Sequence, residues 1–201
     1  MRTILVFTLS IVILLTGCSA AWVSTLDSIL AVAAPALVNI LQIVAVANGQ
    51  PLNSSLATKI NSDALAIRTL ADDFAIVSSS SAPGVCQELQ AAISTYQTDQ
   101  QLVLQIAQVS DTNTQTKISL LAGLVAGTVQ AITAVIPSCQ SAPSAHAFKA
   151  QPSLKVQNFV SEYNAILKIK TGNPAVDALS QKLTLHEHSK VVRVLTLGRL
   201  H

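Results

Sequence analysis

The chain has 201 residues and a formal net charge of +2; half of it is hydrophobic, whereas only 3% is aromatic and 11% is charged. A chain of this size and apolar content can bury a core, which excludes disorder over most of its length. The shortage of aromatic rings argues against stacking sugars or single-stranded nucleic acid on aromatic side chains. Alanine, leucine, valine and isoleucine supply most of the apolar mass, a composition typical of close-packed helices.

The charges are divided unevenly along the chain. Residues 19–138 hold three cations and seven anions, whereas residues 139–201 hold eight cations, three anions and all four histidines. This shift predicts a boundary near residue 138. We therefore expect a helical domain at residues 18–138, a linker at 139–153 rich in Ser, Pro, Ala and Gln, and a basic C-terminal extension at 154–201.

The N-terminus has the pattern of a secretory signal. Arg2 precedes a mostly apolar run from Ile4 to Leu15, and small residues follow. The run is shorter than the ~20 residues of a transmembrane helix. The residues Leu15-Thr16-Gly17-Cys18 resemble the lipobox of bacterial lipoproteins.

This resemblance implies that residues 1–17 are removed as a signal peptide and that Cys18, acylated through its sulfur, becomes the N-terminus. More than one acyl chain, such as palmitate, would hold the protein firmly on a membrane. Ser19 is not the aspartate linked with inner-membrane retention, so we expect the outer membrane, facing the periplasm. The alternatives are an ordinary signal peptide and a retained membrane anchor.

Four segments before residue 138 show helical periodicity. In the first, apolar residues step by three and four from Leu26 to Ala47, although Pro35 is expected to kink or divide the helix. Ser24 or Thr25 can cap its start. The further segments cover residues 55–77, 85–109 and 114–136, separated by short turns. We predict an all-α fold, an antiparallel four-helix bundle.

The cysteines provide a test of this topology. With Cys18 used for lipid, Cys86 at the start of the third helix and Cys139 after the fourth remain. A hairpin turning at residues 110–113 brings both to one end, and an oxidising compartment would let them form a disulfide. The loop of about 50 residues implies roughly 4 kcal/mol on the chain-entropy model. A redox pair is the alternative, which the lack of Cys-x-x-Cys spacing disfavours.

Two uncharged windows, residues 29–47 and 118–136, approach transmembrane length. The second contains Gly123 and Gly127, a spacing that lets membrane helices approach closely. Recurrent Asn, Gln, Ser and Thr in both windows favour buried bundle helices. Membrane insertion or self-assembly through the Gly123/Gly127 helix is the alternative.

The basic C-terminal part predicts a fifth helix at residues 154–170 and a short sixth at 174–183, whereas the β-prone residues 191–197 fit a strand, a helix or a disordered tail. Its cations favour contact with an anionic surface or another envelope protein, a solvated tail being the alternative. His186 and His188 flank Glu187, but without a third ligand the pair is a weak metal signal. We expect no metal, no cofactor and no nucleic-acid partner.

These patterns favour a non-catalytic envelope lipoprotein, a helical scaffold or binding module with no catalytic residues. A membrane-inserting or self-assembling protein is the second interpretation. An enzyme is the third, and it would need buried, paired carboxylates among those expected to be solvated on polar faces: Asp63, Asp72, Asp73, Glu88 and Asp99.

Overall fold

The computed structural model describes residues 2–76, 82–135 and 156–186, and these residues form six helices with no strand among them. The predicted all-α class is therefore confirmed. The helices are α1 Arg2–Ala47, α2 Ser54–Ile76, α3 Ala82–Ile106, α4 Thr112–Val135, α5 Val156–Leu167 and α6 Pro174–Ser180.

Helix α1 differs most from the prediction, because it is one uninterrupted helix from Arg2. No cap separates the apolar N-terminal run from the core helix at Ser24 or Thr25, since residues 18–25 contain neither glycine nor proline. The division expected at Pro35 is also absent. Ala31, whose carbonyl Pro35 leaves without a donor, is an exposed residue, and buried residues on both sides of the proline hold the helix in the core.

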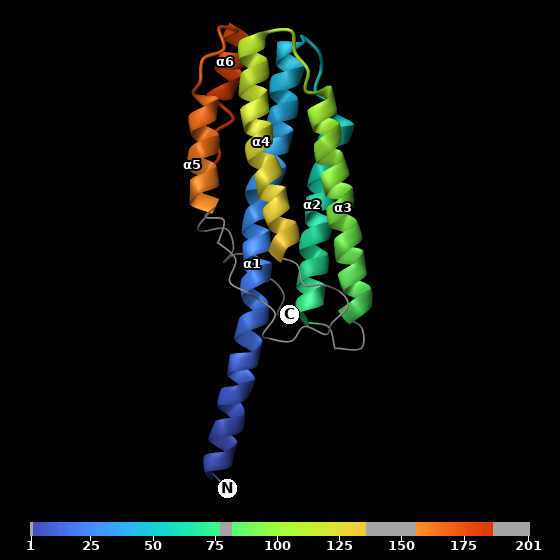
Figure 1. Ribbon diagram of the computed structural model, residues 1–201, viewed down its shortest axis with the longest axis vertical. Helices are drawn as coiled ribbons and strands as arrows, with labels where there is room; N and C mark the ends of the chain where they lie inside the picture. The colour runs from blue at the N-terminus through green and yellow to red at the C-terminus, as the bar shows by residue number, and fades with distance from the viewer. Residues whose placement is uncertain (1, 77–81, 136–155, 187–201) are drawn as a thin grey trace, which may run out of the picture.

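Helix α1 is the centre of the fold. It contacts α2 on one side and α4 on the other, while α3 packs outside α2, α5 packs against α4, and α6 packs against α1 (Figure 1). The apolar stripe predicted for this helix faces the core. Its almost completely buried residues include Leu26, Ile29, Leu30, Ala33, Leu37, Ile40 and Ile43. Contacts between α3 and α4 are sparse by comparison.

Two ion pairs join the first three helices to one another. Arg68 Nε donates to Asp27 Oδ1 at 2.8 Å, which joins the later part of α2 to the start of the packed part of α1. Lys59 Nζ lies 2.6 Å from Asp99 Oδ2, which joins the start of α2 to the later part of α3. Helix α2 is thus joined to α1 on one side and to α3 on the other (Figure 1).

The turns between α1 and α2 and between α3 and α4 are formed by glycine and by side chains that cap the next helix. Gly49 adopts a φ of +62° after α1, a left-handed conformation that suits glycine. Asn53 Oδ1 accepts from the Leu56 amide at 3.0 Å at the start of α2. Asp111 Oδ2 accepts from the Thr114 amide at 2.7 Å at the start of α4. Each side chain thus satisfies an amide that the helix leaves without a partner.

Helices α5 and α6 are shorter than predicted. Asn173 Oδ1 caps α6 by accepting from the amides of Ala175 and Val176, with Pro174 in the first turn as expected. Among the described residues, Val23–Ala47 is long and apolar enough to cross a membrane, but most of it is buried inside the fold. Residues 139–153 and 191–197 lie outside the described part.

Candidate functional site

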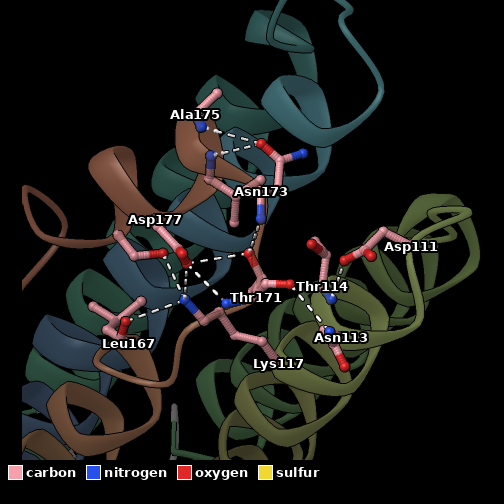
Figure 2. A network of polar contacts seen from close by, with 11 residues as sticks. Asp111, Asn113, Thr114, Lys117, Leu167, Thr171, Asn173, Ala175 and Asp177 are labelled. Carbon is pink, nitrogen blue, oxygen red and sulfur yellow. Dashed lines mark hydrogen bonds and ion pairs between the residues drawn. The ribbon is translucent and has the colours of Figure 1, made fainter.

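The most elaborate polar arrangement joins α4 to the α5–α6 segment and is centred on Lys117, whose side chain is 0% exposed. Lys117 Nζ donates to the Leu167 carbonyl at 3.2 Å and to Ser180 Oγ at 3.0 Å. It also lies 3.7 Å from Asp177 Oδ1 (Figure 2). The ammonium therefore makes two hydrogen bonds, to the ends of α5 and α6, and one ion pair with α6.

Asp177 is itself held by the turn between α5 and α6. Its Oδ1 accepts from the Thr171 amide at 3.0 Å and from Thr171 Oγ1 at 3.1 Å. The Thr171 carbonyl accepts from Asn113 Nδ2 at 3.2 Å, which connects the turn back to the start of α4. Asn173, the cap of α6, donates its amide to Thr171 Oγ1 (Figure 2). The network therefore fixes α4, the turn and α6 in one arrangement.

The electrostatics of this network are those of a buried ion pair. Burial lowers the pKa of Lys117, because desolvation disfavours the charged amine, while Asp177 partly opposes the shift. The Thr171 amide, together with the Thr171 hydroxyl and Lys117, lowers the pKa of Asp177. The ammonium has no solvent exposure and donates to acceptors from α5 and α6, so it holds these helices to α4.

A second polar cluster joins α2 to α3. Lys59 Nζ contacts Asp63 Oδ2 at 2.8 Å and both carboxylate oxygens of Asp99 at 2.8 and 2.6 Å. Asp99 is only 4% exposed, so the prediction that it is solvated on a polar face is wrong. Its position beside the buried Tyr96 explains the difference, because the apolar stripe of α3 widens there.

The two carboxyl groups of this cluster have opposite pKa shifts. Burial raises the pKa of Asp99. Desolvation acts in the same direction on Asp63, but hydrogen bonds with Lys59 and Asp99 outweigh it and lower the pKa of that carboxyl. The hydrogen bonds that Lys59 donates to Asp63 and Asp99 raise the pKa of Lys59. The ammonium thus neutralises the carboxylates, an arrangement suited to joining two helices.

The separation of α3 from α4 leaves an open apolar groove. One part, of about 290 Å³, is lined by Leu104 of α3, by Ala107 directly after α3, and by Ile118, Ala122 and Gly123 of α4, among others. An adjoining part of about 400 Å³ lies over the α3–α4 turn. These volumes fall around the lower limit for small-molecule pockets.

Gly123 and Gly127 of α4 are exposed, and a Cβ atom added at either would meet nothing within 4 Å. These two positions therefore lie outside the buried core of the fold. Leu120, one turn earlier, is also exposed. This face of α4 is uncharged and, within the described residues, no helix packs on the two glycines.

No protein-family model, curated protein or solved structure matches this chain.

The predicted cysteine and histidine sites are only partly described. Cys18 lies within α1, and Cys86 is buried near the start of α3. Because Cys139 lies outside the described residues, the Cys86–Cys139 disulfide stays a prediction. His186 is exposed, whereas Glu187 and His188 lie outside the described residues. In the part that the structure describes, no three His, Cys, Asp or Glu residues gather as metal ligands.

Sequence reasoning did not single out Lys117. A signal was present, because Lys117 is the only charged residue in α4 and lies within the apolar stripe, one turn before Leu121. A lone lysine on such a stripe requires a buried acceptor from another element. The acceptors come from residues 167–180, which no helical period relates to α4.

Proposed function

We propose that this protein is a cell-envelope lipoprotein, attached through acylated Cys18 to the outer membrane and facing the periplasm, and that it acts as a non-catalytic helical scaffold or binding module. The observation that carries the proposal is the position of Leu15-Thr16-Gly17-Cys18 in α1. Cleavage before Cys18 would leave intact the part of α1 that is buried in the core, which begins at Val23.

The finer architecture that we infer is an antiparallel four-helix bundle of residues 18–138 with a basic extension. The pairs Asp27–Arg68 and Lys59–Asp99 support this arrangement for the first three helices. The Lys117 network supports docking of the extension on α4. The extension also presents exposed Lys168, Lys170 and Lys182, which suit an anionic surface or another envelope protein.

A scaffold is favoured over an enzyme by how the lysines of the two polar clusters are used. Lys117 donates hydrogen bonds to acceptors from α5 and α6, and Lys59 bridges carboxylates of α2 and α3. Both clusters thus stabilise contacts between helices. An enzyme would need such groups to face a bound substrate.

The test compares the natural protein with a Cys18→Ala variant exported by a non-lipid signal peptide. We expect the natural protein to fractionate with membranes and to resist high-salt and carbonate washes. The variant should be soluble in the periplasm, with unchanged helical circular dichroism. A variant that stays in the membrane like an integral protein would refute attachment by lipid alone.

A second candidate function, self-assembly through α4, is favoured by the open face at Gly123 and Gly127. Two α4 helices could approach closely there, because neither residue has a side chain. The double variant Gly123→Leu/Gly127→Leu should abolish oligomers seen by analytical ultracentrifugation, and the monomer should stay folded because the added side chains meet open space. The matched control is Gln101→Leu, an exposed position on α3. Identical sedimentation of all three proteins would eliminate this candidate.

A further inference from the structure

The distance between the proposed anchor and the folded body is short. Cys18 lies five residues before Val23, the first described residue of the core, and both belong to the same helix. At 1.5 Å per residue, that is only about 7.5 Å along the helix axis. Residues 18–23 contain no glycine or proline that would act as a flexible tether.

The Asp27–Arg68 pair shows which end of the bundle lies beside Cys18. Cys18 precedes Asp27 by nine residues, and Ile76 follows Arg68 by eight. Because α2 returns along α1, both positions lie about 12–14 Å from the ion pair in the same direction. The last residue of α2 is thus level with the anchor, and Figure 1 shows the end of α2 and the start of α3 at the level where α1 leaves the bundle.

We propose that α1 seats this end of the bundle directly on the lipid surface, with the end of α2 against the headgroups and the Lys117 network at the opposite end. The inference rests on the proposed acylation of Cys18 and specifies the surface that meets the membrane. Ile76, 83% exposed at this end, supplies an apolar contact. Exposed Asp72, Asp73 and Glu88 near the same end keep it out of the hydrocarbon, because buried carboxylates are costly there.

The only tryptophan makes the proposal measurable. Trp22 lies four residues after Cys18 on α1, about 6 Å along the axis. A tryptophan at this position should lie in the interfacial layer, where its ring is favoured. The purified, natively acylated protein is reconstituted in phosphatidylcholine vesicles with and without brominated phosphatidylcholine, and tryptophan emission is recorded.

We expect brominated lipid to remove most of the Trp22 emission. The matched control is Trp22→Phe/Leu52→Trp, which moves the tryptophan to an exposed position between α1 and α2 at the far end; its emission should be unchanged. A variant with ten Gly/Ser residues inserted after Ser19 should lose the quenching, because the tether lifts the bundle.

The outcomes separate the two proposals. Mass spectrometry of the same sample first establishes whether Cys18 is acylated, and an unacylated chain overturns the proposed function. Acylated protein with unquenched Trp22 overturns the direct seating alone. Quenching at Leu52→Trp would show that the bundle lies along the membrane, and quenching retained with the inserted tether would show that Trp22 binds lipid without the seat; either result also overturns it.

Discussion

Replacing either partner of the buried Lys117–Asp177 pair should destabilise the fold, and the loss of Asp177 should cost more than the loss of Lys117. Asp177→Asn leaves a fully buried ammonium with only two neutral acceptors, the Leu167 carbonyl and Ser180 Oγ. Removing one partner of a buried pair costs 3–5 kcal/mol, and the long separation of 3.7 Å reduces this to about 2–3 kcal/mol. The asparagine carbonyl still accepts from Thr171, so the loss reports mainly the unpaired charge.

Lys117→Met should cost less, about 1–2 kcal/mol, because methionine fills a similar volume and Asp177 keeps its bonds from Thr171. The double variant Lys117→Met/Asp177→Asn should be about as stable as Lys117→Met. Once the ammonium is gone, there is no buried charge for the Asp177 carboxylate to compensate, so its loss adds little. Urea unfolding at pH 7 measures all three. The control is Lys168→Met on the surface, which should stay within about 0.5 kcal/mol of the natural protein.

The pH dependence of the stability difference is a second, independent test of the Lys117–Asp177 pair. The pKa of Lys117 is lower in the folded protein than in the unfolded chain, so between these two values the unfolded state binds more protons. The stability difference between the natural protein and Lys117→Met should therefore grow, in favour of the natural protein, as the pH rises through that window towards 10.5. A larger loss for Lys117→Met than for Asp177→Asn, or a difference independent of pH, would refute this account of the pair.

Three further substitutions have defined outcomes. Tyr96→Phe should leave urea stability unchanged or raise it by up to about 1 kcal/mol, because the buried hydroxyl has no hydrogen-bond partner in the described structure. Lys59→Met should lower the free energy of unfolding by about 1 kcal/mol at pH 7 and by less at pH 4. Burial raises the pKa of Asp99, so this carboxyl takes up a proton in acid and no longer needs the ammonium. A loss of stability that grows as the pH falls would contradict this. Asn173→Ala should cost about 1 kcal/mol by removing the cap of α6, with Asn158→Ala as the exposed control and equal melting temperatures as the contrary result.

The existence and type of the helices could be predicted because each carries a local period. The stripe through Leu26 and Ile40 and the turn at Gly49 depend only on neighbours a few residues away. The division at Pro35 was expected from local chemistry too, but packing on both sides of the proline overrides it. The prediction failed where tertiary contacts compensate a local penalty.

The Lys117 network could not be predicted from the sequence, for a different reason. Lys117 and Asp177 are separated by 60 residues, and their pairing depends on how the α5–α6 segment docks on α4. Burial of Asp99 likewise depends on Lys59 from another helix. The open face at Gly123 reflects the sparse contact between α3 and α4, which a regular bundle would have closed.

Mass spectrometry of the mature N-terminus tests the central proposal most directly. The protein is extracted from membranes with detergent, digested, and its N-terminal peptide is sequenced with the acyl mass retained. The account predicts a chain that begins at Cys18 and carries acyl groups. A chain that begins at any other residue, or an unmodified Cys18, would contradict it.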